Sequence, residues 1–199
     1  MFYITVILLS DLLIILANAA AGGLFGDIRA MLFLALSVIG GTVAVIAVDG
    51  AGAFIIRRLI PERFFAPDCP AFAVGAKEQK LYRRLKINTW KDKVPELGVF
   101  TGFNKSRFES STDVEYLGRF LVESNYGVVI HLENAIFGWL ILFIPFCRMP
   151  SIWLPIAAVN FVLSLLPVAV LRYNTRPLRF LYSRSIKKSE VSIDTGSSI

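Results

Sequence analysis

Near the start of the chain, residues 3–21 read YITVILLSDLLIILANAAA and residues 31–56 read MLFLALSVIGGTVAVIAVDGAGAFII. About 20 apolar residues, each rising ~1.5 Å in a helix, cross the roughly 30 Å hydrocarbon core of a bilayer. Inside the two stretches the only charged residues are Asp11 and Asp49. The pair therefore predicts a transmembrane hairpin whose turn lies at residues 22–29.

The N-terminal stretch also has to be compared with a secretory signal peptide. Ala17, Ala19 and Ala21 resemble a cleavage site, but no basic side chain precedes the apolar core and a second apolar stretch follows at once. A cleaved signal has a basic leader and is not followed by such a stretch. We therefore expect residues 1–21 to be retained as a helix.

A second pair of apolar segments, at residues 134–146 and 152–171, predicts another hairpin. Its first segment spans the bilayer only if the helix begins near Val128, which puts His131 and Glu133 at its cytoplasmic mouth. Hydrophobic residues make up 55% of the chain and gather in these blocks, whereas a soluble domain holds about 45–50%. We predict an all-α membrane protein of about four transmembrane helices in two hairpins, with a basic cytoplasmic interfacial segment between them.

The cationic residues predict the orientation of these helices. Of the 21 Lys and Arg residues, 13 lie between Arg57 and Arg119 and six follow Leu171, whereas each hairpin turn holds one. Cytoplasmic loops are the ones enriched in Lys and Arg, so the N-terminus, the middle segment and the C-terminus are expected in the cytoplasm. The predicted parts are the hairpins at 1–60 and 131–182, the interfacial segment at 61–130 and a disordered polar tail at 183–199.

Composition and charge restrict the kinds of molecule and metal that the chain is expected to bind. The formal net charge is +6, which on a membrane protein indicates attraction to anionic lipid, and no nucleic-acid-binding signature is found. Cys69 and Cys147 lie far apart, so we expect reduced thiols, no disulfide and no metal site. The sequence contains no nucleophile elbow, phosphate-binding loop or dinucleotide fingerprint.

Three polar stretches are candidates for chemistry. The first runs from Trp90 to Glu96, with Lys105 further on. Trp90 suits the headgroup layer, and Lys91, Lys93 and Lys105 are candidates to hold the phosphates of a coenzyme. The alternative interpretation of this stretch is an interfacial anchor on anionic lipid.

The second stretch holds His131, the chain's only histidine. Glu123, Gly127 and His131 are spaced four apart and share a helix face, which suits a base and its orienting group. Because eight residues rise ~12 Å, Glu123 does not touch His131 directly, and Glu133 or another helix is the closer partner. The alternative is a plain polar anchor at the membrane surface.

The third stretch, Arg172, Tyr173, Asn174 and Arg176, follows the last apolar segment. Arginines there complement the helix dipole and the orientation rule, but these effects do not explain the Tyr–Asn pair. Asp11 and Asp49 are acids within spans, which by default suggests function. For both acids the alternative is simple contact with the membrane interface.

Taken together, the stretches resemble the glycosyl-4,4′-diaponeurosporenoate acyltransferase family, small bacterial membrane proteins of carotenoid biosynthesis. The resemblance covers roughly residues 60–180. It rests on Tyr82, Ile87, Trp90–Lys91–Asp92–Lys93, Pro95–Glu96 and Lys105, on Glu123 with His131, and on Pro167 followed by Arg172–Tyr173–Asn174 and Arg176–Pro177. The chain departs from the family pattern at Val128, Leu132 and Leu171, and it carries Thr175 as an extra residue.

The resemblance implies a membrane-bound acyltransferase of the bacterial cell membrane. It implies transfer of a fatty acyl group from a thioester, acyl-CoA or acyl carrier protein, to a hydroxyl of a lipid or glycolipid, with no tightly bound cofactor. His131 is then the base, with Glu123 or Glu133 orienting it. Donor or headgroup would be bound by the remaining polar residues, namely Trp90, Lys91, Asp92, Lys93, Glu96, Lys105, Arg172, Tyr173, Asn174 and Arg176. The alternative function is a non-catalytic partner subunit or lipid-binding scaffold, alone or as an oligomer.

Overall fold

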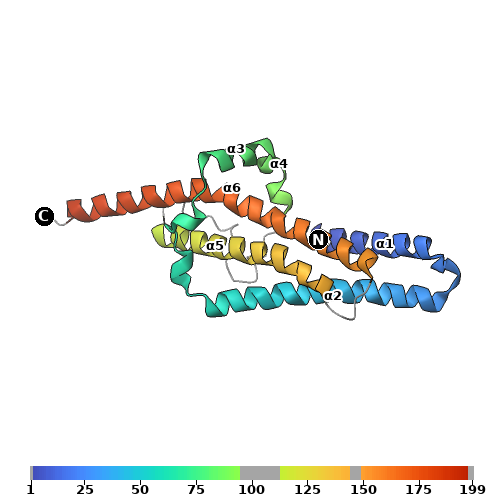
Figure 1. Ribbon diagram of the computed structural model, residues 1–199. Coiled ribbons are helices and arrows are strands. Elements are labelled where there is room, and N and C mark those ends of the chain that lie inside the picture. The colour runs from blue at the N-terminus through green and yellow to red at the C-terminus, as the bar shows by residue number, and fades with distance from the viewer. Residues whose placement is uncertain (1, 95–112, 144–148, 197–199) are drawn as a thin grey trace. The chain divides into compact units, whose positions relative to one another are not determined.

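A computed structural model describes residues 2–94, 113–143 and 149–196, and this part of the chain forms helices and no strand (Figure 1). Four of its helices are long and apolar enough to cross a membrane. They are α1 (Phe2–Gly22), α2 (Ile28–Leu59), α5 (Val114–Phe137, continued by the 3-10 helix η6 at Gly138–Phe143) and α6 (Pro150–Gly196). The predicted all-α class with four candidate spans is confirmed.

Short helices connect the long ones. The turn after α1 holds η1 (Leu24–Gly26), and the polar middle of the chain holds η2 (Glu62–Phe65), η3 (Pro70–Phe72), α3 (Ala76–Arg84), α4 (Ile87–Trp90) and η4 (Lys91–Lys93). α3 is rich in basic residues, with Lys77, Lys80, Arg83 and Arg84 in its nine positions. Residues 95–112 lie outside the described residues.

The chain folds into two compact units, each built from two separate stretches of sequence. Unit 1 comprises Met1–Ile56 and Ile130–Leu166, and unit 2 comprises Arg57–Val129 and Pro167–Ile199. The helices α2, α5 and α6 each contribute residues to both units. Unit 1 therefore joins parts of both predicted hairpins, whereas unit 2 joins the interfacial segment to the C-terminal part of α6.

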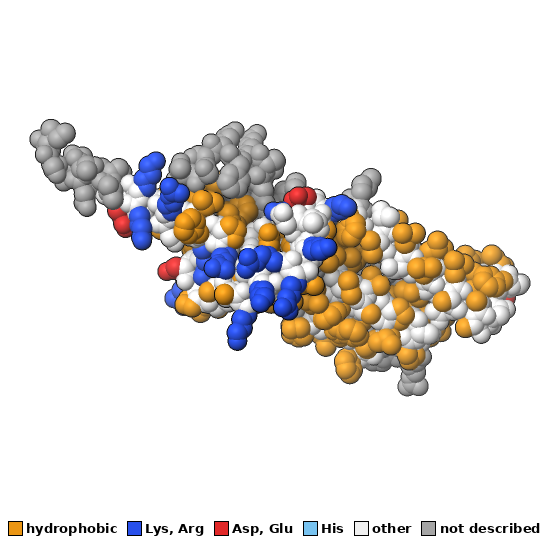
Figure 2. Space-filling model, turned by 90° about the horizontal axis from the view of Figure 1, so that it is seen from above, with side chains coloured by type: hydrophobic (Ala, Val, Ile, Leu, Met, Phe, Trp, Pro, Cys, Tyr) orange, Lys and Arg blue, Asp and Glu red, His pale blue; other side chains and the backbone are white. Residues whose placement is uncertain are grey.

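Unit 1 has a small apolar core inside a mostly exposed apolar surface. Val38, Val45, Ile152 and Ala157 are among its buried residues, and Gly41 of α2 lies so close to Trp153 and Ile156 of α6 that an added Cβ would be 2.9 Å from both. By contrast, large side chains elsewhere on α1 and α2 stay exposed, and orange side chains cover this surface in Figure 2. Such a surface is typical of helices that face lipid.

In unit 2, α6 continues far beyond the apolar segment that begins it. The apolar segment was expected to end at Leu171 and the tail from 183 to be disordered, but α6 is helical through Gly196. The reason is a second core, in which Leu178, Leu181 and Tyr182 of α6 pack against Leu117, Phe120 and Leu121 of α5. No glycine or proline interrupts residues 178–195, so nothing ends the helix earlier.

The proline-rich segment that follows α2 is held by side chains of α5. Fully buried Asn125 donates from its amide nitrogen to the carbonyls of Phe65 and Ala66, at 3.0 and 3.2 Å. Tyr126 donates to the carbonyl of Ile60 and stacks on the Phe65 ring with centroids 3.7 Å apart. Because prolines prevent a regular helix here, these side chains supply hydrogen bonds that buried carbonyls need.

α5 begins at a side-chain cap. The Asp113 carboxylate accepts the backbone N–H groups of Glu115 and Tyr116, at 3.0 and 3.4 Å. This arrangement satisfies donors that the first helical turn leaves free.

Candidate functional site

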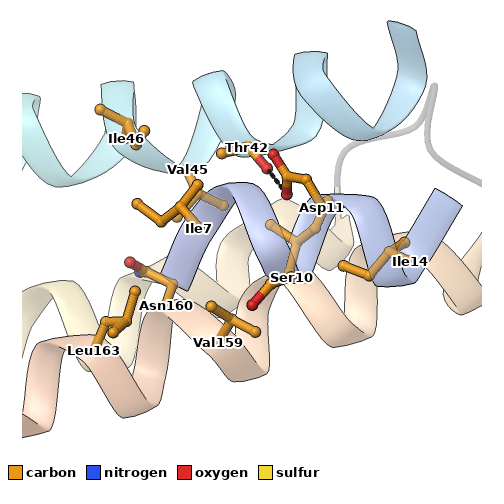
Figure 3. A pocket seen from close by; sticks show the side chains of 11 residues that line it. Ile7, Ser10, Asp11, Ile14, Thr42, Val45, Ile46, Val159, Asn160 and Leu163 are labelled. Atoms are coloured by element: carbon orange, nitrogen blue, oxygen red, sulfur yellow. Dashed lines mark hydrogen bonds between the residues drawn. The ribbon is translucent and has the colours of Figure 1, made fainter. Parts of the chain in front are cut away.

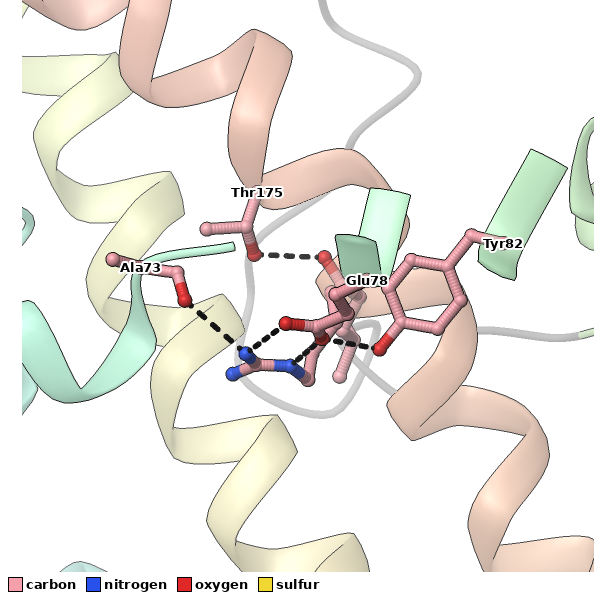
Figure 4. A network of polar contacts seen from close by, with 6 residues as sticks. Ala73, Glu78, Tyr82 and Thr175 are labelled. Atoms are coloured by element: carbon pink, nitrogen blue, oxygen red, sulfur yellow. Dashed lines mark hydrogen bonds and ion pairs between the residues drawn. The ribbon is translucent and has the colours of Figure 1, made fainter. Parts of the chain in front are cut away.

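α3 is fixed to α6 by an ion pair within unit 2 (Figure 4). The Arg172 guanidinium donates from Nε and Nη2 to the two Glu78 carboxylate oxygens, with 2.8 Å between Nη2 and Oε2. Nη2 also donates to the carbonyl of Ala73, and the Tyr82 hydroxyl donates to Glu78. A guanidinium that binds both oxygens of a carboxylate fixes orientation as well as distance.

This network shifts the pKa of Glu78 and of Tyr82, its two side chains on α3. The hydrogen bonds from Arg172, more than any other effect, hold the pKa of Glu78 below its usual value, so the carboxylate is charged at neutral pH. Burial, with Glu78 beside it, raises the pKa of Tyr82 to about 12, so the phenol stays neutral. The network is therefore a charged clamp with a neutral hydroxyl, and it holds no group that titrates near pH 7.

The clamp shows which groups Arg172 contacts. Its guanidinium donates to Glu78 and to the Ala73 carbonyl, and binding of a phosphate or headgroup by this arginine stays a prediction. Arg179, two turns further along α6, likewise donates to the carbonyl of Cys69. Both arginines hold the extended segment before α3, whereas Arg176 between them is exposed.

The tryptophan stretch and the arginine stretch come together in unit 2. The Lys91 ammonium lies over the Tyr173 ring, 5.6 Å from its centroid, and the Trp90 indole N–H donates to the carbonyl of Leu85 at 3.1 Å. Trp90 is partly exposed, and Lys93 is exposed. We call the five residues Trp90, Lys91, Lys93, Tyr173 and Arg176 the α4–α6 surface.

The remaining candidate residues of these two stretches make no polar contact that the structure describes. Asp92 is exposed and Asn174 is partly buried, and neither has a hydrogen bond or ion pair with another described residue. Glu96 and Lys105 lie outside the described residues.

The turn between α3 and α4 has an unusual backbone. Lys86 has φ of 51° and ψ of 38°, and it is the only non-glycine residue with positive φ in the described part of the chain. A side chain in this left-handed conformation costs roughly 1–2 kcal/mol. The Thr89 hydroxyl donates to the Lys86 carbonyl at 2.8 Å, which helps to hold the turn that delivers Trp90 and Lys91.

The proposed acid–base residues all lie on α5 but belong to different units. His131 and Glu133 are in unit 1, and Glu123 is in unit 2. Glu123 accepts a hydrogen bond from Arg57 at 2.7 Å, and Arg57 also lies over the Tyr126 ring. Glu123 is therefore engaged with an arginine. His131 is partly buried and has no hydrogen bond or ion pair with the described residues.

Glu133 lies against the backbone of α2. A Cβ at Gly52 would be 2.2 Å from both carboxylate oxygens of Glu133, so only glycine leaves room for them. One turn earlier on α2, Asp49 accepts a hydrogen bond from Asn160 of α6 at 3.3 Å, and Asn160 also donates to the Asn134 carbonyl. Polar side chains from α2, α5 and α6 thus meet within unit 1.

Asp11 lines a pocket among α1, α2 and α6 of unit 1 (Figure 3). The Thr42 hydroxyl donates to its carboxylate at 2.8 Å, and the rest of the lining is mostly aliphatic. The cavity volume of about 30 Å³ suits one or two waters, whereas ligand sites measure several hundred Å³. Both acids within the spans thus have polar partners.

Two residues that build unit 2 were missed by sequence reasoning. Glu78 is the only acid within the basic helix and lies four residues before Tyr82, a spacing that puts both on one helix face. This spacing was enough to predict that Glu78 and Tyr82 lie side by side on α3. Asn125 gives no such signal, because its partners are carbonyls 59 and 60 residues away.

Comparison with known proteins gives one result. The family model for glycosyl-4,4′-diaponeurosporenoate acyltransferase matches residues 61–184. The chain belongs to this family. The match includes the clamp, the α4–α6 surface and His131. Membership indicates an acyltransferase of carotenoid biosynthesis and agrees with the resemblance read from the sequence. No curated protein and no solved structure matches the chain.

The described residues contain no group of three or more His, Cys, Asp or Glu side chains arranged to hold a metal ion. Cys69 is a free thiol, partly buried, whose backbone carbonyl accepts the Arg179 hydrogen bond. Cys147 lies outside the described residues.

Proposed function

We propose that this family member transfers a fatty acyl group from a thioester to a hydroxyl of a lipid or glycolipid at the cytoplasmic leaflet of the bacterial cell membrane. The observation that carries the proposal is the family match over residues 61–184. Two polar stretches in that range meet at the α4–α6 surface, through the contact of Lys91 with Tyr173.

In the proposed step, an imidazole nitrogen of His131 takes the proton of the acceptor hydroxyl. The resulting oxygen attacks the thioester carbonyl, a C–O bond forms, and the C–S bond then breaks. The thiolate leaves and takes the proton from the imidazolium, so the enzyme returns to its starting state. A positioned base of this kind contributes about 10²–10⁴-fold.

The remaining polar residues divide by the contacts they make. Glu123 is bound by Arg57, and Glu133, two residues from His131 on α5, lies on a different side of that helix against Gly52, so an orienting role for either carboxylate stays a prediction. The α4–α6 surface is proposed to bind the donor, through Lys91, Lys93 and Arg176 for its phosphates and Trp90 for an apolar or aromatic part. Asp92, Asn174, Glu96 and Lys105 stay predicted contributors, and Arg172 becomes a positioning residue. The donor is a co-substrate, acyl-CoA or an acyl carrier protein.

Replacement of His131 tests the base. Membranes that contain His131→Ala or His131→Asn are expected to transfer acyl groups at least about 100-fold more slowly, measured as labelled acyl group incorporated into extracted lipid or glycosylated carotenoid. Arg184→Gln, a change at an exposed position of α6, is the matched control and should leave transfer unchanged.

Two results would contradict the proposal. Undiminished transfer by a folded His131 variant removes the base. Failure of the purified wild-type chain to transfer any acyl group, together with its recovery in a stoichiometric complex with an active enzyme, favours the non-catalytic partner instead.

A further inference from the structure

One face of α3 is packed against the rest of unit 2, whereas the other face is exposed. Tyr82 is buried, with 8% exposure, and Glu78 beside it on the same face is held by Arg172. Leu81 and Leu85 are 51% and 53% exposed. Because the clamp fixes the rotation of the helix about its axis, the leucines cannot turn inward to replace Tyr82.

The cations of α3 lie beside these leucines. Lys77, Lys80 and Arg84 are spaced three and four residues apart, so they share one face, and all three are exposed. None of them has an ion pair with another described residue. Figure 2, seen from the side on which α3 lies in Figure 1, shows Lys and Arg side chains gathered with hydrophobic side chains next to them.

The same combination recurs elsewhere in unit 2. Leu59 and Phe64 are 70% and 55% exposed, next in sequence to the exposed Arg58 and Arg63. The Arg63 guanidinium lies over the Phe64 ring, 5.3 Å from its centroid. Large apolar side chains next to long cations are typical of segments that lie in a membrane interface.

We propose that α3 is an interfacial helix whose outer face binds anionic phospholipid. Leu81 and Leu85 enter the boundary of the acyl chains, while Lys77, Lys80 and Arg84 bind headgroup phosphates. A bilayer fits this face better than an acidic protein does, because the chain has four candidate spans and the bilayer is therefore next to unit 2 at all times. The charge also matches, since the cytoplasmic leaflet of a membrane is negative.

The proposal separates two sets of basic residues. The three cations of the α3 outer face anchor the helix to lipid, whereas Lys91, Lys93 and Arg176 of the α4–α6 surface remain for the acyl donor. The Glu78–Arg172 clamp joins the anchored helix to α6. This division does not depend on the reaction, so it can be tested without an assay of acyl transfer.

Quenching by brominated lipid tests the contact directly. The full chain, with Cys69→Ser and Cys147→Ser, is labelled with an environment-sensitive dye at Leu81→Cys and reconstituted in phosphatidylcholine bilayers with or without phosphatidylglycerol. We expect brominated phosphatidylglycerol to quench the dye more than brominated phosphatidylcholine does. A dye at Lys188→Cys, an exposed position of α6, should show little quenching by either lipid.

Charge variants then test the headgroup contacts. The triple variant Lys77→Gln/Lys80→Gln/Arg84→Gln should lower the relative binding constant for phosphatidylglycerol at least about tenfold. The matched triple variant Arg184→Gln/Lys187→Gln/Lys188→Gln removes the same charge from α6 and should keep it. High salt should weaken the preference, since exposed charges are screened.

Each remaining outcome overturns part or all of the proposal. No quenching at position 81 in either lipid excludes α3 from the bilayer. Equal quenching by both lipids retains the leucine contact but removes the anionic site. Displacement of the lipid from the dye by coenzyme A would assign the α3 cations to the donor instead.

Discussion

At the scale of single residues, Lys86 offers the sharpest test of the backbone between α3 and α4. Its φ of 51° suits glycine, so Lys86→Gly is expected to unfold at higher temperature than Lys86→Ala, by about 0.5–1 kcal/mol in the free energy of unfolding. Both variants remove the same charge, so their difference isolates the backbone. Thermal unfolding in detergent measures it, and an alanine variant as stable as the glycine variant would contradict the left-handed turn.

Single residues also show where sequence reasoning reached its limit. Trp90, Lys91 and Tyr173 were singled out from residue type and spacing, and the structure brings Lys91 to the Tyr173 ring. The pairing of Arg172 with Glu78 was not predicted, because an arginine at the end of an apolar helix looks the same whether it binds a phosphate or a carboxylate 94 residues away. Its partner is a property of the folded chain alone.

At the scale of helices, the attachment of α3 to α6 is expected to depend on pH. Because Arg172 lowers the pKa of Glu78, the carboxylate stabilises the fold above its ordinary pKa of 4.5. This contribution is lost as the pH falls through the lower pKa of the folded state. Thermal unfolding should therefore show a drop in stability below about pH 4.5 for the wild-type chain.

The variant Glu78→Gln shows whether the clamp causes that drop. It leaves the guanidinium of Arg172 without its carboxylate, so we expect a loss of about 2 kcal/mol at pH 7 and a flatter pH dependence. Glu190→Gln removes an exposed acid of α6 and should change neither quantity. If the stability of the Glu78→Gln variant fell at low pH as steeply as that of the wild-type chain, another carboxylate would be responsible.

The helices differ in how far their sequence predicts them. The apolar runs of α1 and α2 were located within a few residues, because a run of about twenty apolar residues forms a transmembrane helix more readily than any other structure. The C-terminal half of α6 was missed because its charged residues hide the apolar positions Leu178, Leu181 and Tyr182. Their spacing of three and four is helical, and the contact with α5 makes the helix persist.

At the scale of the whole molecule, an even number of crossings by the four candidate spans would put both ends of the chain on one side of the membrane, and the positive-inside rule predicts that this side is the cytoplasm. In a background without Cys69 and Cys147, an impermeant maleimide added to intact cells should label Gly26→Cys but not Lys188→Cys. Gly26 lies in the first turn with open space around it. Labelling of Lys188→Cys before the cells are broken would reverse the orientation.

The division into units lay beyond sequence reasoning. Apolar blocks and polar blocks alternate along the chain, and the predicted boundaries followed that alternation. The structural units instead divide α2, α5 and α6 within their lengths, because a long helix can pack against one set of partners at one end and another set at the other. Tertiary contacts of this kind have no local signature.

The two arginines of α6 that hold the segment before α3 also constrain the order in which parts of the chain can fold during synthesis. Their partners, Glu78 and the Cys69 carbonyl, precede them by 94 and 110 residues. At about 5–20 residues per second, a ribosome needs several seconds or more to deliver them. During that interval neither hydrogen bond can form, so the docking of α3 and the segment before it on α6 is a late step of biogenesis.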